Sequence, residues 1–109
     1  CYNYFIPLHM IYITQIIYIQ PGKEDAFHDF EDVVIPLISK YNGQLLLRLR
    51  PSDVSVIERN IETPYEIHIV EFTSQKDFDN FKSDEERNKV LHLKEQSIKS
   101  SILIQGEKL

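Results

Sequence analysis

Apolar and polar positions along the chain follow two different periods. In four short stretches they alternate every second residue, which is typical of β-strands. In two stretches between them the apolar residues recur every three or four positions, which is typical of amphipathic helices. The order of these stretches predicts a β-α-β-β-α-β chain.

The predicted strands cover residues 11–19, 44–50, 65–72 and 102–107. The first strand is apolar on both faces, because Tyr12 and Ile16 share one face and Ile13 and Ile17 share the other. Such a strand is typical of the middle of a sheet. In the second strand, simple alternation predicts one apolar side, formed by Leu45, Leu47 and Leu49.

The first predicted helix follows the Pro21-Gly22 turn. Its apolar stripe consists of Phe27, Phe30, Val34, Leu37, Ile38 and Tyr41. Pro36 removes a backbone hydrogen bond and should kink the last turns, and Asn42-Gly43 should form a left-handed cap. The acidic residues of this helix, Asp29, Glu31 and Asp32, are expected on its solvent face.

The second helical region begins with Ser74 and Asp77, which form a variant of the capping box before a short helix. Ser83 and Glu86 repeat the signal and predict a longer helix that ends near Lys99. Residues 51–64 are mainly polar and are expected to form, in part, an extended hairpin arm. The length of this arm alone suggests docking of another protein as one further role.

This order of elements predicts an α+β, ferredoxin-like domain, with a four-stranded antiparallel sheet and both helices on one face. The other face of the sheet would then be uncovered, although three of the strands carry apolar residues on both faces. Soluble proteins rarely leave so large an apolar patch in water. We therefore expect the protein to form a homodimer with itself through the open sheet face.

The charge and cysteine content of the chain argue against several classes of binding partner and site. The chain has 109 residues, with 12 Lys and Arg against 17 Asp and Glu, and a net charge of −5. This acidic balance, without a basic cluster, argues against a nucleic-acid surface and against an anionic membrane. The single cysteine, Cys1, excludes an internal disulfide bond and a cysteine-rich zinc site.

The start of the chain looks at first like a targeting segment. The apolar run from Tyr4 to Ile19 is interrupted by Pro7 and His9, and no basic residue precedes it. It therefore lacks the features of a secretory signal or a membrane-spanning helix. We expect residues 1–9 to be an N-terminal extension, residues 10–109 to be a single domain, and the protein to be cytoplasmic.

Several short motifs carry a resemblance to a known family. They are Pro36, Tyr41-Asn42-Gly43, Glu58, the run from Glu71 to Ser74 before Phe78, and the run from Ser83 to Glu86. With these the chain resembles the dimeric α/β-barrel superfamily, and most of all an uncharacterised bacterial domain-of-unknown-function family related to the antibiotic-biosynthesis monooxygenases. The family usually has Gly-Gly where this chain has Asn42-Gly43. The resemblance implies two ferredoxin-like protomers that form a barrel, with a small cavity between sheet and helices, and it implies no activity.

His68 is the first candidate for chemistry, because it lies between isoleucines in the third strand. A desolvated histidine could be a general base with a shifted pKa. It could equally be a neutral core histidine bonded to a neighbouring tyrosine or carboxylate. Glu66, on the same face, and Tyr65, at the start of the strand, could complete a polar cluster around it.

Arg48 and Arg50 share one side of the second strand and could hold the carboxylate of a ligand. Alternatively, Arg48 pairs with Glu66 or Glu71 across the sheet. Tyr12 could line a ligand cavity, although tyrosine is also common in strand packing.

The sequence predicts no metal site and no cofactor. His28 and His92 lie on different helices, and neither is followed by a second histidine or a cysteine one helical turn later. Two hypotheses about function remain. In the first, a homodimer binds a small organic molecule as a cofactor-free oxygenase or isomerase, with His68 as base and Arg48 and Tyr12 as positioning groups. In the second, the dimer is a non-catalytic structural or ligand-sensing module whose cavity its own side chains fill.

Overall fold

The computed structural model describes residues 9–109, so the predicted extension over residues 1–9 lies outside the described residues except for His9. The strands are β1 (Ile11–Ile19), β2 (Gly43–Leu49), β3 (Glu66–Phe72) and β4 (Ile98–Gly106). The α-helices are α1 (Glu24–Val34), α2 (Gln75–Lys82), α3 (Glu85–Lys89) and α4 (Leu91–Ser97). Two 3-10 helices, η1 (Ile35–Tyr41) and η2 (Asp53–Ser55), complete the elements.

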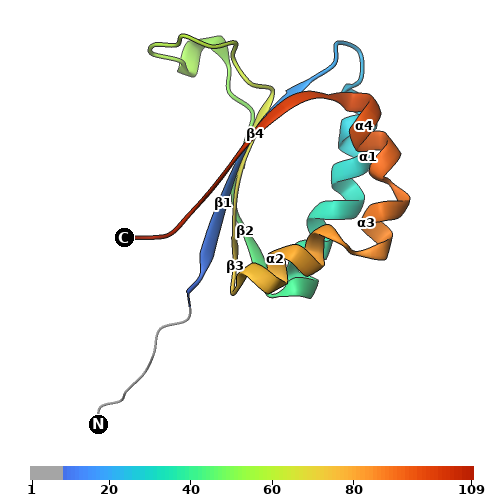
Figure 1. Cartoon of the computed structure of the whole chain (residues 1–109). Helices are drawn as coiled ribbons and strands as arrows, with labels where there is room; N and C mark the ends of the chain where they lie inside the picture. The colour runs from blue at the N-terminus through green and yellow to red at the C-terminus, as the bar shows by residue number, and fades with distance from the viewer. Residues whose placement is uncertain (1–8) are drawn as a thin grey trace.

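The four strands form one antiparallel sheet in the order β2-β3-β1-β4. Figure 1 shows this sheet with the α-helices on one side and no helix against the middle of the other side. The predicted α+β architecture and the central position of β1 are therefore confirmed. No helix in residues 9–109 has the length and apolar character needed to cross a membrane.

The core lies between the sheet and the helices. It is built from Ile13, Phe30, Val34, Ile38, Val70, Phe72, Phe78 and Phe81. The predicted stripe of the first helix thus faces the core: Phe27, Phe30, Val34 and Ile38 are buried, and Leu37 and Tyr41 are partly buried. Pro36 has the expected effect, because α1 ends at Val34 and the chain continues as the tighter helix η1. Asn42 then adopts the left-handed conformation with φ 58°, as the cap predicts.

The second helical region differs from the prediction in its boundaries. The cap of α3 is Asp84 rather than Ser83, and its side chain accepts a hydrogen bond from Arg87 N. The predicted single helix is interrupted at Val90, whose φ of −109° and ψ of 9° leave the helical region. Strand β4 begins at Ile98, because pairing with β1 already starts opposite Ile19. Pairing across the sheet therefore outweighs the local helical signal in residues 98–99.

Residues 51–64 do not form the predicted hairpin arm. They contain no strand, and their regular structure is limited to η2, which Ser52 and Ser55 cap reciprocally. Prolines at both ends remove backbone donors that a hairpin ladder would need. The segment is instead attached to the sheet by side-chain and backbone contacts, such as the 2.7 Å bond from Tyr18 Oη to the carbonyl of Glu62.

Strand β2 contains an irregularity that simple alternation misses. Its register with β3 shifts between Leu45 and Leu47. Leu45 therefore packs against the core, whereas Leu47 and Leu49 lie on the face of the sheet away from the helices. The prediction that all three leucines share one side is wrong, because one extra residue in a strand reverses the side-chain order beyond it.

The sheet face opposite the helices is apolar across all four strands. We call it the open face; its central residues are Ile16, Leu47, Leu49, Ile67, Ile69, Ile102 and Ile104. Leu47 and Ile102, on the two outer strands, are each 45% exposed. Within the described chain, no α-helix covers the middle of this face, and several of its large apolar side chains are exposed.

Candidate functional site

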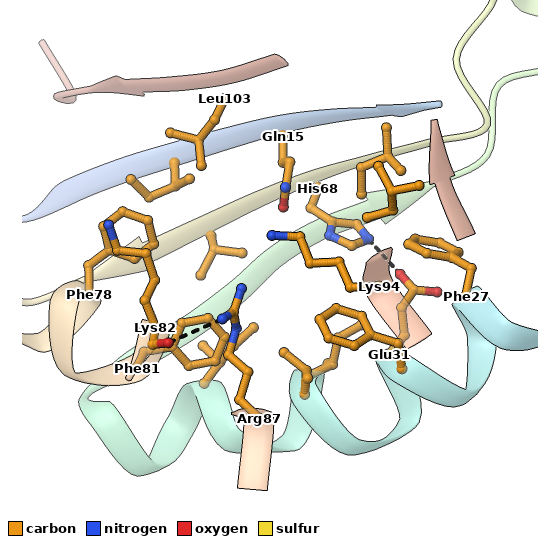
Figure 2. A pocket seen from close by; sticks show the side chains of 18 of the residues that line it. Gln15, Phe27, Glu31, His68, Phe78, Phe81, Lys82, Arg87, Lys94 and Leu103 are labelled. Atoms are coloured by element: carbon orange, nitrogen blue, oxygen red, sulfur yellow. Dashed lines mark hydrogen bonds and ion pairs between the residues drawn. The ribbon is translucent and has the colours of Figure 1, made fainter. Parts of the chain in front are cut away.

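A cavity of about 140 Å³ lies between the sheet and the helices. Its walls are mainly apolar, and the aromatic rings of Phe27, Phe30, Phe78 and Phe81 contribute to them. Six polar side chains also line it, namely Gln15, Glu31, His68, Lys82, Arg87 and Lys94 (Figure 2). A small apolar pocket with a few convergent polar groups is typical of a ligand site.

His68 reaches this cavity from the middle of β3. Alternation along the strand turns Glu66, His68 and Val70 toward the helices, and His68 is only 9% exposed. It lies in one row across the sheet with Arg48 of β2 and Gln15 of β1. The predicted burial of His68 is therefore confirmed.

Glu31 approaches His68 from helix α1. It follows Phe27 by four positions and precedes Val34 by three, so it lies within the apolar stripe and is only 3% exposed. The prediction that Glu31 belongs to the solvent face is wrong, because the helical spacing that buries Phe27 and Val34 also buries the residue between them. Of the three acids in this run, Asp29 and Asp32 are exposed as expected.

The two glutamates and the histidine form one cluster. His68 Nε2 contacts Glu66 Oε2, and it lies 2.9 Å from Glu31 Oε2. One ring N–H cannot serve both carboxylates fully, so Glu31 Oε2 shares its contact with His68, and no other donor within residues 9–109 reaches it. Figure 2 shows Glu31 and His68 facing one another at one end of the cavity.

Two partly exposed arginines, Arg48 in β2 and Arg50 just after its end, bind the carboxylates of Glu31 and Glu66. Arg48 donates from Nη2 to Glu31 Oε1 at 2.8 Å and from Nε to Glu66 Oε2 at 3.2 Å. Arg50 donates from Nε to Glu66 Oε1 at 2.7 Å. The predicted pairing of Arg48 with Glu66 is thus confirmed, and both carboxylates are fixed by charge-assisted bonds.

The cluster shifts the acidity of its members. Burial opposes ionisation of Glu66, but hydrogen bonds from His68 and Arg50 outweigh it and hold the pKa of Glu66 well below its usual range. Burial raises the pKa of Glu31, helped by the nearby charge of Glu66. For His68, burial favours the neutral ring, but hydrogen bonds to Glu31 and Glu66 prevail and raise its pKa. The contact predicted for a core histidine, a bond to a carboxylate, is confirmed. The predicted neutral ring is not favoured, because the raised pKa of His68 favours the protonated imidazolium.

Two cations, Arg87 and Lys94, line the same cavity from the last helices. Arg87 belongs to α3, where no sequence pattern marks it as a cavity residue, and its guanidinium lies over the rings of Phe30 and Phe81, at 6.0 and 5.7 Å from their centres. Lys94 shares the apolar stripe of the last predicted helix with Val90 and Ile98, and this helical spacing places it at the cavity. Burial lowers the pKa of each, and for Lys94 the charge of Arg87 adds to this effect.

The remaining predicted residues do not line the cavity. Tyr12 lies on the open face, opposite Glu71 of β3, and so on the other side of the sheet from His68. Tyr65 stands just before β3, and its hydroxyl lies 2.6 Å from His28 Nε2. Its ring also packs edge-on against Phe27. The structure therefore brings Glu66 and Arg48 to His68 and leaves Tyr12 and Tyr65 apart from it.

Glu31, Glu66 and His68 also have the composition of a metal site. Their ligand atoms lie within 4.8 Å of one another. However, Arg48 and Arg50 already donate to these carboxylates, and two guanidinium groups beside a site disfavour a bound cation. The charges of the two carboxylates are offset by the two arginines and His68. The cluster therefore does not favour a bound metal ion.

Comparisons with known proteins identify the fold and no more specific class. No family model and no curated protein matches the chain. Among solved structures, a protein of unknown function from Rhodopseudomonas palustris has a TM-score of 0.79 at 14% identity, over 94% of this chain and 84% of that one.

Two further structures extend this likeness. A dimeric protein of unknown function with a ferredoxin-like fold, from Bacteroides fragilis, has a TM-score of 0.68 at 13% identity, over 96% of this chain and 100% of that one. A DABB family protein with a ferredoxin-like fold, from Mesorhizobium loti, has a TM-score of 0.70 at 13% identity, over 93% and 98% of the two chains. The chain thus has a ferredoxin-like fold, as the sequence resemblance implies.

Proposed function

We propose that the protein binds a small organic molecule in the cavity and moves a proton on it, with Glu31 and His68 as the acid–base pair. The observation that carries this proposal is Glu31 Oε2, a buried carboxylate oxygen at the cavity that faces His68 Nε2 at 2.9 Å and has no other donor among residues 9–109. Because His68 Nε2 also contacts Glu66, this oxygen shares its donor, and buried polar groups that are not fully satisfied are candidates for a functional role.

The pair suits both removal and return of a proton. A general base works best when its pKa lies near the working pH. Burial raises the pKa of Glu31, and bonds to Glu31 and Glu66 raise the pKa of His68 against the effect of burial. Glu66 remains ionised and, with Arg48, holds the histidine in place. Glu66 and Arg48 are therefore positioning residues, and neither lines the cavity.

An isomerase follows most directly from this arrangement. The pair would take a proton from a carbon next to a carbonyl and return it to another atom of the same molecule, so that no electron leaves the substrate. A cofactor-free oxygenase would begin with the same step, and its carbanion would then transfer electrons to dioxygen. The polar groups that line the cavity favour both reactions over a module with a filled core.

Exchange of carbon-bound hydrogen tests the proton transfer without knowledge of the natural substrate. Cyclohexanone and 2-oxobutyrate would be incubated with the protein in deuterated buffer, and loss of their α-proton signals followed by NMR. We expect the protein to accelerate exchange, and Glu31→Gln and His68→Gln each to lower the enzymatic rate by about 100-fold or more.

His92→Gln is the matched control, because His92 is exposed on α4. It should keep the rate of the unmodified protein. Folded Glu31→Gln and His68→Gln proteins with the unmodified rate would refute the acid–base assignment. Binding of both ketones without any exchange would instead favour the non-catalytic ligand-sensing module.

We further propose that two copies of the chain associate through the open face. Support comes from the exposed Leu47 and Leu49 on one outer strand and the exposed Ile102 and Ile104 on the other, which flank Ile16, Ile67 and Ile69 on the same face of the sheet. A second copy would offer the same apolar surface, as a two-fold interface requires. Tyr12 would then belong to this interface rather than to the ligand cavity. The structure from Bacteroides fragilis is described as dimeric.

A further inference from the structure

Arg87 and Lys94 line the cavity without a carboxylate partner. Within residues 9–109, no ion pair joins either side chain to an aspartate or glutamate. The Nε atom of Arg87 is buried and has no hydrogen-bond acceptor in the part of the chain that the structure describes. Its one side-chain hydrogen bond there runs from Nη1 to the carbonyl of Lys82, at 3.1 Å.

Leaving two cations in a mainly apolar cavity is costly unless an anion accompanies them. At the other end of the cavity, the charge of Glu31 is already matched by Arg48 and His68. The wall formed by α3 and α4 therefore keeps an excess of positive charge. Figure 2 shows Arg87 and Lys94 projecting into the space that His68 borders.

We propose that the ligand of this cavity is a small carboxylate with an apolar body, and that Arg87 and Lys94 bind its carboxylate group. This inference rests on the proposed function and specifies its substrate class. A planar guanidinium matches the two oxygens of a carboxylate, and a lysine supplies a second, mobile donor. The apolar body would pack against Phe30, Phe78 and Phe81.

The size of the cavity sets the size of that body. An apolar cavity of about 150 Å³ is known to hold benzene, and this one has about 140 Å³. The apolar part of the ligand is therefore one six-membered ring or a chain of similar bulk. With its carboxylate at Arg87 and Lys94, the far side of the ligand would approach His68 and Glu31, where a proton is exchanged.

Benzoate and benzamide provide a matched pair of probes, because they share a shape and differ in charge. Their binding to the full chain would be measured by isothermal titration calorimetry, together with inorganic phosphate as a non-carboxylate anion. We expect benzoate to bind at least about tenfold more tightly than benzamide, since bonds to charged groups are the stronger ones. Phosphate should bind more weakly than benzoate, because it lacks an apolar body.

Lys94→Met and Arg87→Gln test the two cations separately. Each should reduce the preference for benzoate over benzamide. The control is Lys89→Met, because Lys89 lies on α3 and its side chain is 70% exposed. If Arg87→Gln fails to fold, Lys94→Met alone decides, since the hydrogen bonds of Lys94 within residues 9–109 involve its backbone and not its side chain.

Equal affinity for benzoate and benzamide would overturn the inference, and so would a preference that survives both substitutions. Phosphate binding as tight as that of benzoate would assign a general anion site instead. These outcomes are separate from the proton-transfer test. If the protein accelerates exchange on cyclohexanone but does not prefer benzoate, the acid–base pair stands and the carboxylate assignment fails.

Discussion

Glu31 of helix α1 and His68 of strand β3 meet with 2.9 Å between Oε2 and Nε2, and both side chains are buried. They come from the two layers of the domain, so their distance depends on how the helix packs on the sheet. An interaction of this kind is stronger in a low-dielectric interior than in water. Its strength should therefore be visible both in the chemistry of the cavity and in the stability of the fold.

Stability should fall as pH rises above the ordinary range of histidine. The pKa of His68 is raised in the folded protein, with burial opposing the shift and bonds to Glu31 and Glu66 causing it. Below about pH 6.5, the ring is protonated in the folded and the unfolded state, and its ion pairs contribute fully. As pH rises through the folded pKa, the proton is lost and so is this contribution. Glu31, whose pKa burial raises, acts with the same sign.

Urea denaturation across neutral and alkaline pH would measure this slope. The free energy of unfolding of His68→Gln should depend less on pH above about 6.5 than that of the unmodified protein. His92→Gln, which changes an exposed histidine, should keep the original slope. A His68→Gln protein with an unchanged slope would show that the ring is not the group that titrates.

Removal of the Glu66 charge should destabilise the domain. Its side chain is fully buried and accepts hydrogen bonds from Arg48, Arg50 and His68. Glu66→Gln keeps the volume but leaves three donors facing a neutral amide. Because the two arginines are partly exposed, we expect the lower end of the usual cost for breaking a buried pair, about 3 kcal/mol.

Thermal and urea unfolding would measure this loss. Glu62→Gln is the control, because Glu62 is 64% exposed in its pair with Lys99. Exposed ion pairs contribute little, so its effect should stay within about 0.5 kcal/mol. Equal stabilities of the two variants would mean that the buried cluster does not stabilise the fold.

The periodic elements were predictable because their signals are local and strong. The spacing of Phe27, Phe30 and Val34 identifies helix α1, and the β-branched pattern of β1 identifies a central strand. The bulge in β2 was not predictable, since Leu45 and Leu47 fit a regular strand as well as a bulged one. Only pairing with β3 decides between them.

The candidate site was predictable only in part. His68, Glu66 and Arg48 share one face of two neighbouring strands, so pattern alone brings them together. Glu31 reads as part of an acidic run until its position in the helical stripe is given weight. Arg87 lines the cavity from the short helix α3, and the break at Val90 that ends this helix has no clear local signal.

Gly43 should not tolerate a side chain. A Cβ at this position would lie 2.6 Å from Phe72 Cε1 and 2.7 Å from Ile38 Cγ2, both in the core. Gly43→Ala should therefore cost about 1–3 kcal/mol, the usual range for overpacking. Gly106→Ala is the control, because nothing lies within 4 Å of a Cβ there. Chemical denaturation of both variants would measure the difference, and equal effects would contradict the close packing of Gly43.

A charge in the middle of the open face should separate the proposed dimer. Ile69 lies opposite Thr14 on β1 and Leu47 on β2, so its side chain points away from the helices and outside the cavity. In a dimer, Ile69→Lys would bury two unpaired ammonium groups at one interface. This should raise the dissociation constant by at least about 100-fold. In a monomer the same lysine would remain in water and should leave the fold intact.

Sedimentation velocity at micromolar concentration would distinguish the two cases. We expect the unmodified protein to sediment as a dimer and Ile69→Lys to sediment as a folded monomer. Leu109→Lys is the matched control, because Leu109 is fully exposed beyond the end of β4 and should leave the dimer intact. A monomeric unmodified protein would refute association through the open face. It would leave the acid–base pair unaffected, because Glu31 and His68 lie on the other side of the sheet, within one chain.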